Sequence, residues 1–388
     1  MFDLVYHQDI FYHITYNKSY LVAVSGFSHL NRVKYEPESG EILKVYLQKC
    51  DTYSDSNRIL RNILDEFSGD FRAGERVLVK VNMLSPRPAE RAVTTRAEIV
   101  RGVLKFLLER GTNPFVGDSP AVGSAVKVAQ ACGIMEVCQE LSVPVVDLNN
   151  PIKKDGQVYK RINISSAVFD ADKVVNIAKL KTHAQMVLTL GVKNTFGCVP
   201  GLEKSRWHVR CGTNENFAKL LVDVHLLVNP VLTVIDGVEG MEGDGPSNGE
   251  KKRFGLIAAS KNAFALDHAI AVRLGIKPES IHTINESMQR KLIEKYEVVG
   301  DWEGSIKLPS TSHVLPIPGF LKKIVRSTVR VPKINKRRCV SCRICEKRCP
   351  VHAIDIDAHR VDTGKCIRCY VCHEVCPENA IRLVVKIF

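Results

Sequence analysis

The chain has 388 residues, of which 45% are hydrophobic and 25% charged, with a formal net charge of +13. These values are typical of globular domains and exclude a wholly disordered or collagen-like chain. No apolar run reaches the ~20 residues that cross a bilayer, and the first residues do not resemble a secretion signal. We therefore expect two or three folded units in the cytoplasm, where clustered cysteines indicate metal or redox chemistry rather than disulfides.

The first segment, residues 1–43, is expected to stand apart from the folded domains as an N-terminal extension. It contains paired aromatic stretches, and three interpretations stay open. The segment forms a hairpin on a domain edge, or is a mobile extension, or reflects a start assigned too far upstream. A later start requires a non-standard codon, because no methionine lies between Met1 and Met83.

Residues 44–309 alternate short apolar runs with helical patterns. Strands are expected at 45–50, 76–81, 113–118, 143–148, 173–180, 231–236 and 254–260. Helices are expected at 56–67, 97–111, 124–140, 215–228 and 263–275. This alternation predicts an α/β main domain with a mostly parallel sheet and helices on both faces.

Polar side chains follow several of these strands, at the edge where parallel sheets bind their ligands. Because lysines dominate this set, we expect a pocket for an anionic small molecule, either a substrate or a cofactor. The residues expected to bind it are Lys80, Asn82, Asp118, Ser119, Lys179, Asn194, Lys204, His208 and Asp236.

The stretch 179–212 is the densest in such residues, and its glycines allow the backbone to approach a ligand closely. Desolvated lysines act as acids or bases, and histidine transfers protons near neutral pH. We therefore assign catalytic roles to Lys181, His183 and Lys193. For His183 and His208, a structural role fits the sequence equally well.

The loop expected at 236–249 is rich in glycine and contains Glu239, Glu242 and Asp244. It is expected to bind a hard cation or to close over the pocket as a lid, although its spacing is not that of a calcium loop. The chain has no P-loop and no GxGxxG motif, so ordinary nucleotide binding is not supported. An additional divalent metal or a flavin in the pocket stays open.

A basic linker is expected at 310–335. From Ser310 to the end there are 16 lysines and arginines against 6 acids, a net of +10, which leaves +3 for the first 309 residues. Within 319–338, one face of a short helix carries Phe320, Leu321, Ile324 and Val325. Such a helix lies on a membrane surface or packs on the main domain, and we favour packing because the apolar face spans only about two turns.

Two cysteine runs with the spacing C-x2-C-x2-C-x3-C-P lie within residues 336–388. The spacing is that of bacterial two-cluster ferredoxins, in which the fourth cysteine of each run ligates the other [4Fe-4S] cluster. The expected ligand sets are Cys339, Cys342, Cys345 and Cys376 for cluster 1, and Cys366, Cys369, Cys372 and Cys349 for cluster 2. We therefore expect a small α+β ferredoxin-like domain with two clusters.

Two zinc sites are the alternative interpretation, but a third thiolate at this spacing is unusual for zinc. Arg343 and Tyr370 stand where many ferredoxin repeats have glycine. Thiolate-ligated clusters are anionic, so the basic tail suits charge compensation or an acidic redox protein partner better than nucleic acid. We expect no nucleic-acid partner.

The stretches VLVKVNML, GDSP, KLKTHAQMVLTLGVKNTFGCVPG and VIDGVEGMEGDGP resemble the family known as domain of unknown function 362. The resemblance covers roughly residues 44–275, with the ferredoxin module at 336–388. It implies an iron–sulfur protein, often described as an oxidoreductase, without a named substrate. The glycine–lysine–proline loop has a slight resemblance to the nickel-pincer lactate racemase, from which we derive nothing.

Three functions are compatible with these features. The first is an oxidoreductase that passes electrons through two [4Fe-4S] clusters to an anionic substrate or cofactor in the α/β domain. The second is an electron-transfer or docking subunit without catalysis. The third is a protein that handles a cofactor or metal. We favour the first.

Overall fold

The structure is a computed structural model that describes residues 42–312 and 328–387. Residues 1–41, expected as an extension, lie outside the described residues. So do residues 313–327, which include the apolar face expected on the linker helix. The described residues from Leu43 onward pack as one unit.

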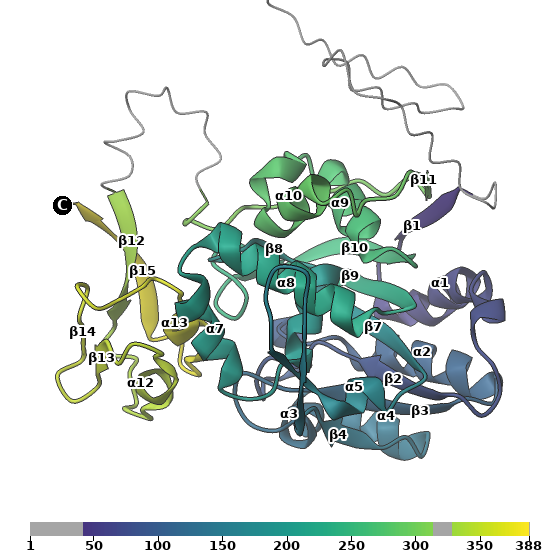
Figure 1. Cartoon of the computed structure of the whole chain (residues 1–388), viewed down its shortest axis with the longest axis horizontal. Helices are drawn as coiled ribbons and strands as arrows, with labels where there is room; N and C mark the ends of the chain where they lie inside the picture. The colour runs from purple at the N-terminus through teal and green to yellow at the C-terminus, as the bar shows by residue number, and fades with distance from the viewer. Residues whose placement is uncertain (1–41, 313–327, 388) are drawn as a thin grey trace, which may run out of the picture. The chain divides into compact units, whose positions relative to one another are not determined.

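A sheet of nine strands, counted within the described residues, forms the centre of the main domain (Figure 1). Its spatial order is β11 (Tyr296–Val299), β1 (Leu43–Lys49), β10 (Glu250–Ser260), β9 (Leu232–Glu242), β7 (Lys173–His183), β2 (Arg76–Lys80), β3 (Asn113–Asp118) and β4 (Val145–Asp147), with β8 (Val187–Thr189) beside β7. The run from β9 to β4 is parallel, as is the pair β11–β1, whereas β10 is antiparallel to both of its neighbours. The predicted mostly parallel α/β domain is confirmed.

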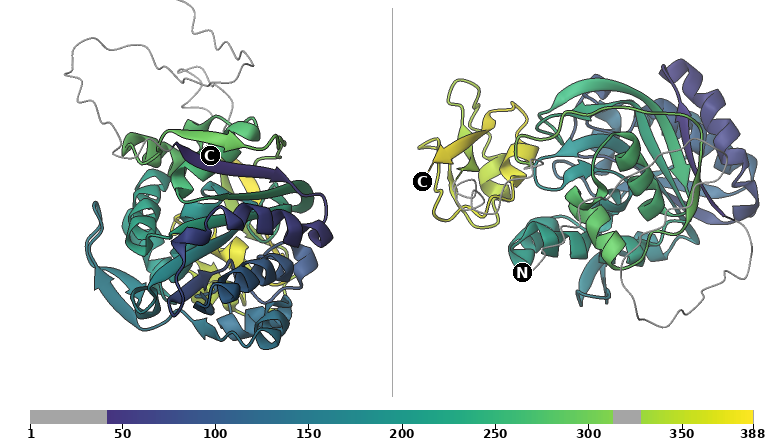
Figure 2. Two further views of the ribbon diagram at one scale, coloured as in Figure 1. Left: turned by 90° about the vertical axis from the view of Figure 1, so that its right-hand side faces the viewer. Right: turned by 90° about the horizontal axis from the view of Figure 1, so that it is seen from above.

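Helices cover both faces of this sheet (Figure 2). Val77 and Val79 of β2 pack with α1 and α2, whereas Leu78 between them packs with Phe217 of α8. This alternation follows from the period of two in a strand. One face carries α1 (Tyr53–Asp65), α2 (Ala97–Glu109), α3 (Ala125–Ala131) and α4 (Ile134–Glu140), and the other carries α8 (Asn214–Val228), α9 (Ala263–Arg273) and α10 (His282–Gln289).

Smaller elements complete the main domain. They are the hairpin of β5 (Pro151–Lys154) and β6 (Ile162–Ser165), and the helices α5 (Ser166–Phe169), α6 (Gly191–Asn194), η3 (Thr195–Cys198) and α7 (Glu203–Cys211), with further 3-10 turns at 68–70, 89–91 and 278–280. The helix expected at 124–140 is divided into α3 and α4 because Gly133 adopts a φ of 80°. No helix in the described ranges has both the length and the apolar character needed to span a membrane.

The expectation of a loop at 236–249 is wrong for its first half, because strand β9 continues to Glu242. Glycines make this continuation feasible. A Cβ at Gly240 would lie 2.3 Å from the carbonyl oxygen of Leu180 on β7, so only glycine fits there. The loop proper is confined to 243–249.

The C-terminal part contains two copies of one local structure, in agreement with the expected α+β domain. Its elements are β12 (Thr328–Ile334), α12 (Ile344–Arg348), β13 (Ile354–Asp355), β14 (Arg360–Val361), α13 (Val371–Val375) and β15 (Ile381–Ile387). β12 pairs with β15 at the end of the chain, so this part includes residues before the boundary expected at 336. Arg343 and Tyr370 precede the two helices with φ of 58° and 57°, which explains why glycine suits these positions in related repeats.

Candidate functional site

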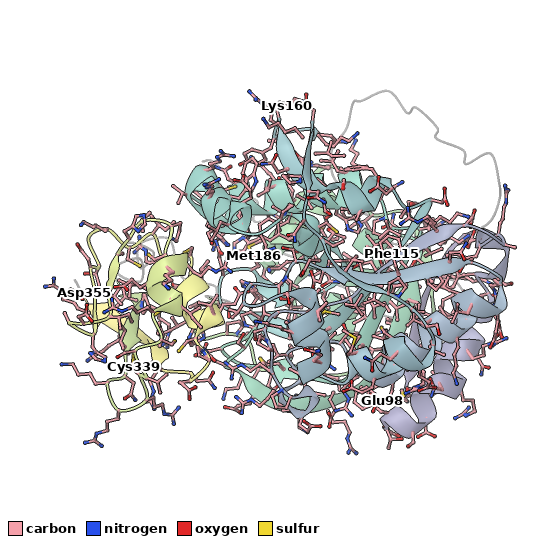
Figure 3. All side chains as sticks on the ribbon, turned by 90° about the horizontal axis from the view of Figure 1, so that it is seen from below. Glu98, Phe115, Lys160, Met186, Cys339 and Asp355 are labelled. Atoms are coloured by element: carbon pink, nitrogen blue, oxygen red, sulfur yellow. The ribbon has the colours of Figure 1, made fainter. Side chains whose placement is uncertain are left out.

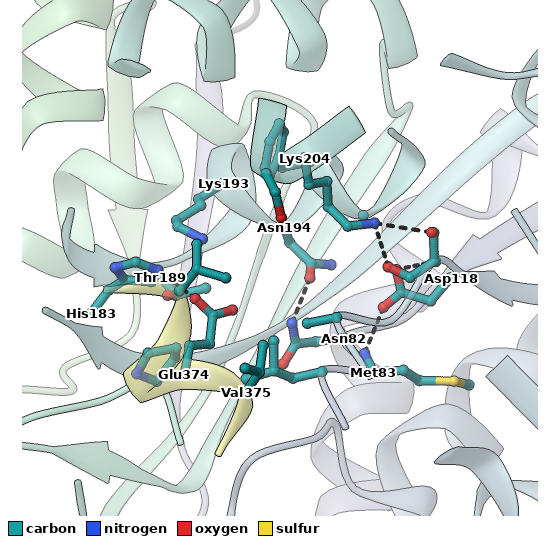
Figure 4. A pocket seen from close by; sticks show the side chains of 18 of the residues that line it. Asn82, Met83, Asp118, His183, Thr189, Lys193, Asn194, Lys204, Glu374 and Val375 are labelled. Atoms are coloured by element: carbon teal, nitrogen blue, oxygen red, sulfur yellow. Dashed lines mark hydrogen bonds and ion pairs between the residues drawn. The ribbon is translucent and has the colours of Figure 1, made fainter. Parts of the chain in front are cut away.

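A large cavity lies between the parallel strands and helix α13 of the C-terminal part (Figure 4). This lysine cavity measures about 800 Å³ with its open mouth. Residues that follow β2 and β3, and the last residues of β7, form one wall, as expected for the carboxyl ends of parallel strands. Of the expected site residues, its wall contains Lys80, Asn82, Asp118, Ser119, Lys181, His183, Lys193, Asn194, Lys204 and His208.

Lys179 and Asp236 of the expected set are placed elsewhere. The Lys179 ammonium donates to Asp236 Oδ2 and to the Tyr53 hydroxyl, both at 2.8 Å, and the Asp236 carboxylate also accepts the Arg96 backbone N–H. Lys179 faces the same side of β7 as Lys181, but Tyr53 and the segment that enters α2 cover it. The two residues form a fully buried ion pair, which corrects the expectation that they contact the ligand.

Asp118 anchors one end of the lysine cavity. Its carboxylate accepts the Met83 backbone N–H at 2.6 Å and lies 3.1 Å from the Lys80 ammonium. A Cβ at Gly197 would lie 2.2 Å from Asp118 Oδ1, so this close approach requires glycine. The charge of Lys80 is therefore neutralised within the wall itself.

Lys204 is tied to the same end of the cavity. Its ammonium donates to the carbonyl oxygen of Ser119 at 2.7 Å, to the Ser119 hydroxyl at 3.0 Å and to the carbonyl oxygen of Val199 at 2.8 Å. Burial lowers the pKa of Lys204 to about 8. The lysine is thus oriented by the protein and carries a charge that varies near physiological pH.

Lys181 and two asparagines form a row of hydrogen bonds across the cavity. Lys181 Nζ donates to Asn82 Oδ1 at 2.8 Å and to the carbonyl oxygen of Val93 at 2.7 Å. Asn82 in turn donates to Asn194 Oδ1 at 3.0 Å. Burial lowers the pKa of Lys181 to about 7. The neutral amine keeps both donated bonds and gains a lone pair, so this lysine can accept a proton.

His183 is held in one tautomer. Its Nδ1 accepts the backbone N–H groups of Gln185 at 3.1 Å and Met186 at 3.2 Å, so the ring proton resides on Nε2. Burial, and then the positive charge of Lys193, lowers its pKa well below the usual range. The neutral ring therefore points an N–H group toward Glu374, whose carboxylate lies 3.7 Å from Nε2.

Several polar groups of the cavity have no hydrogen-bond or ion-pair partner among the described residues. Thr189 Oγ1 and His208 Nδ1 are buried without a hydrogen bond, and the Lys193 ammonium forms no hydrogen bond or ion pair. Burial lowers the pKa of Lys193 and lowers that of His208 to about 3. Because an unsatisfied buried polar group costs about 1–3 kcal/mol, this end of the cavity favours a ligand with acceptor oxygens.

Glu374 is a site residue that the sequence analysis does not identify. It enters the cavity from α13 together with Val371, while Arg348 enters from α12. In the sequence Glu374 lies between Cys372 and Cys376, where it reads only as part of a cysteine run. No local signal marks it, because its contact with the main domain is a product of tertiary packing.

Two smaller cavities lie within the C-terminal part. The Cys342 cavity, of about 340 Å³, is lined by Cys339, Cys342, Cys345 and Cys376. The Cys372 cavity, of about 310 Å³, is lined by Cys349, Cys366, Cys369 and Cys372. In each, three cysteines of one run meet the fourth of the other, which is the arrangement expected from the spacing.

These cavities suit [4Fe-4S] clusters better than zinc. Within residues 42–312 and 328–387, no group of three or more His, Cys, Asp or Glu side chains is placed to hold a metal ion. Zinc requires its ligands to converge on one point, whereas a cluster occupies a hollow such as these cysteines surround.

The acidic residues of the β9–β10 hairpin pair with lysines across it. Glu239 lies 3.1 Å from Lys251 and Glu242 lies 3.0 Å from Lys252. Their carboxylates are therefore engaged in ion pairs, which argues against the hard-cation site expected here. Neither an additional divalent metal nor a flavin gains support from the described residues.

Comparisons with known proteins identify the family of the main domain and the iron–sulfur repeats of the C-terminal part. Residues 77–272 match the model of the family described as domain of unknown function (DUF362), and residues 332–355 and 359–382 match the 4Fe-4S binding domain. The thylakoid-associated protein sll1697 of Synechocystis sp. is 36% identical over 288 residues, which cover 70% of this chain and 88% of that protein. The structure of the lactate racemase apoprotein from Thermoanaerobacterium thermosaccharolyticum aligns over 50% of each chain with a TM-score of 0.35 and 10% identity, too slight a likeness to carry an argument.

Proposed function

Because this chain belongs to the family of the domain of unknown function 362 and carries two 4Fe-4S binding repeats, we propose that it is an iron–sulfur oxidoreductase. Its substrate or cofactor is an anionic small molecule held in the lysine cavity. Clusters bound in the Cys342 and Cys372 cavities supply one-electron transfer. The cysteines that line each cavity are the proposed ligands of its cluster.

The observation that carries this proposal is that helix α13 and the residue that follows it, Cys376, together line all three cavities. Val371 lines both the lysine cavity and the Cys372 cavity. Glu374 and Val375 line the lysine cavity, and the next residue, Cys376, lines the Cys342 cavity. The segment 371–376 therefore joins the proposed ligand site to both sets of cysteines, an arrangement that an independent docking module would not need.

Several polar residues of the cavity have a proposed role. Lys193, Thr189 and His208 bind the anionic group, because each has a polar atom without a hydrogen bond to any described residue. Lys181 accepts a proton as the neutral amine, and the neutral His183 ring donates a hydrogen bond from Nε2. Asn82 and Asn194 keep Lys181 in place through their hydrogen bonds, so the role of these asparagines is positioning.

We propose a cytoplasmic location, because clustered thiolates persist in a reducing compartment. The thylakoid association in the name of the Synechocystis relative is a statement about that protein. The surface contact considered for 319–338 falls largely on residues outside the described ranges.

The test is native mass spectrometry of protein purified without oxygen. Wild type is expected to retain an anionic small molecule together with about eight irons. Lys193→Ala is expected to lose the molecule and keep the iron, because Lys193 binds the anion and lines neither cysteine cavity. Lys295→Ala, on the exposed surface, serves as the matched control and is expected to behave as wild type.

Equal retention by Lys193→Ala and the control would contradict the proposed anion site. A wild type that carries no small molecule, combined with electron delivery to an acceptor that Lys181→Ala and Lys193→Ala leave unchanged, would favour the alternative of a non-catalytic electron-transfer subunit.

A further inference from the structure

The exposed segment 335–343 lies at the mouth of the Cys342 cavity, and we call it the basic rim. We propose that the basic rim is the docking site of a small acidic one-electron carrier protein. The inference rests on the proposed oxidoreductase function and adds the surface at which electrons arrive. One electron leaves the reduced carrier and reduces this protein by one electron, and no bond forms or breaks.

The two cysteine cavities differ in what adjoins them. The Cys372 cavity shares Val371 with the lysine cavity. The Cys342 cavity shares none of its described wall residues with the lysine cavity. The Cys372 cavity is therefore on the ligand side, which leaves the Cys342 cavity as the one available to an external partner.

The Cys342 cavity also reaches the surface. Among the cysteines of the described residues, Cys342 is the exposed one. Val340, which lines the same cavity, is 63% exposed. An exposed ligand beside an exposed apolar side chain suits a protein contact, since electron transfer needs close approach and a carrier interface needs some apolar area to bury.

The charges of the basic rim are unpaired. Its exposed cations without an ion pair or side-chain hydrogen bond to any described residue are Lys336, Arg337 and Arg338. Arg343, by contrast, pairs with Glu346 and Asp357. No acid occurs in 335–343, although Glu378 lies in the wall of the same cavity. A cluster of unpaired cations attracts and orients an acidic partner.

Nitrogen-tipped side chains project from the C-terminal part on the side where Cys339 is labelled (Figure 3).

The cations of the basic rim have a second explanation, which is compensation for the negative charge of a bound cluster. The two explanations predict different observables. Compensation changes the reduction potential, whereas docking changes the affinity for the carrier and its dependence on ionic strength.

The test uses the full chain loaded with its [4Fe-4S] clusters, and a small acidic [2Fe-2S] ferredoxin as the carrier. The variant Lys336→Glu/Arg337→Glu/Arg338→Glu is compared with Arg58→Glu/Lys153→Glu/Lys295→Glu, which makes the same change of charge at exposed, unpaired sites of the main domain. Calorimetric titration with the oxidised ferredoxin measures affinity, and stopped-flow bleaching of the clusters by the reduced ferredoxin measures the rate.

The rim variant is expected to lose about tenfold or more in affinity and rate at low ionic strength, with a flatter salt dependence, while the control stays close to wild type. Reduction by photoexcited 5-deazariboflavin, a neutral small molecule, and the iron content are expected to be unchanged. The milder Lys336→Gln/Arg337→Gln/Arg338→Gln variant is expected to fall between wild type and the charge reversal.

Equal losses in the rim and control variants, or a loss in the rim variant that follows a changed reduction potential, would overturn the docking proposal. These readouts follow binding of the ferredoxin and reduction of the clusters, and neither requires a ligand in the lysine cavity. Failure of the docking proposal is thus distinguishable from failure of the proposed oxidoreductase function.

Discussion

The lysines of the large cavity differ in what holds them. Lys80 is neutralised by Asp118, and Lys181 and Lys204 each donate to oxygens of the wall. Lys193 forms no such bond with any described residue. A lysine without a protein partner retains its full capacity for a ligand, so Lys193 is the residue on which the anion proposal depends most.

The first prediction at the residue scale concerns pH. The pKa of Lys181 is lowered to about 7 and that of Lys204 to about 8, in both cases chiefly by burial. Both are ammonium below pH 7, and each loses its charge as pH rises through its lowered pKa. Affinity for sulfate, an anion that does not itself titrate there, is therefore expected to fall between pH 6.5 and 9, by up to about tenfold per unit while one lysine titrates.

Calorimetric titration of sulfate at several pH values checks this expectation. In Lys204→Met the fall near pH 8 is expected to disappear while the fall near pH 7 stays. An affinity that is constant or rises with pH would show that the charges of Lys181 and Lys204 do not contribute to anion binding.

At the scale of elements, α6 depends on α9 for its position. Asp267 of α9 accepts the backbone N–H of Gly191 at 2.8 Å and of Val192 at 3.0 Å, and thereby holds the start of the short helix that carries Lys193. Asp267 is 2% exposed, so water does not replace it readily. The Asp267 carboxylate thus supports the site through these two hydrogen bonds, although it does not line the cavity.

Asp267→Ala is therefore expected to lower stability by about 2–4 kcal/mol, because two buried N–H groups lose their acceptor. Thermal unfolding of the cluster-loaded protein measures this loss of stability. Asp267→Asn keeps one acceptor oxygen and is expected to show an intermediate effect. A change below about 0.5 kcal/mol in Asp267→Ala would show that α6 is held by other contacts.

For the whole molecule, hydrogen bonds between the main domain and the C-terminal part set the position of α13. Arg87 donates to the carbonyl oxygen of Cys376 at 2.8 Å, and Asn248 donates to the carbonyl oxygen of His373 at 2.7 Å. His373 Nε2 also lies 3.1 Å from the carbonyl oxygen of Asp244. These contacts keep Glu374 and Val371 in the wall of the lysine cavity.

Arg87→Ala is expected to loosen this attachment without loss of iron, since it removes one charge-assisted hydrogen bond to backbone and no cysteine. Hydrogen exchange at the amides of α13 is expected to be about tenfold faster, which corresponds to about 1.4 kcal/mol. Arg91→Ala, an exposed arginine of the same segment, is the control. Unchanged exchange in Arg87→Ala would mean that the other contacts suffice.

The sequence alone predicts the class of fold and most of the polar residues in the wall of the lysine cavity. Strand and helix periods are properties of neighbouring residues, so the alternating elements of 44–309 follow from the order of apolar and polar side chains. The carboxyl ends of parallel strands share one edge, which is why Lys80, Asp118 and Lys181 are predicted to meet. The cysteine spacing is equally local, and it specifies four-iron ligation without reference to the rest of the chain.

Only the tertiary structure decides which of these residues face the ligand and what closes the site. Lys179 and Lys181 have the same orientation on β7, yet one is covered by α1 and the start of α2 while the other lines the cavity. Glu374 meets His183 because the C-terminal part packs against the strand ends. Neither outcome is encoded in local spacing, since both depend on how elements distant in the chain come together.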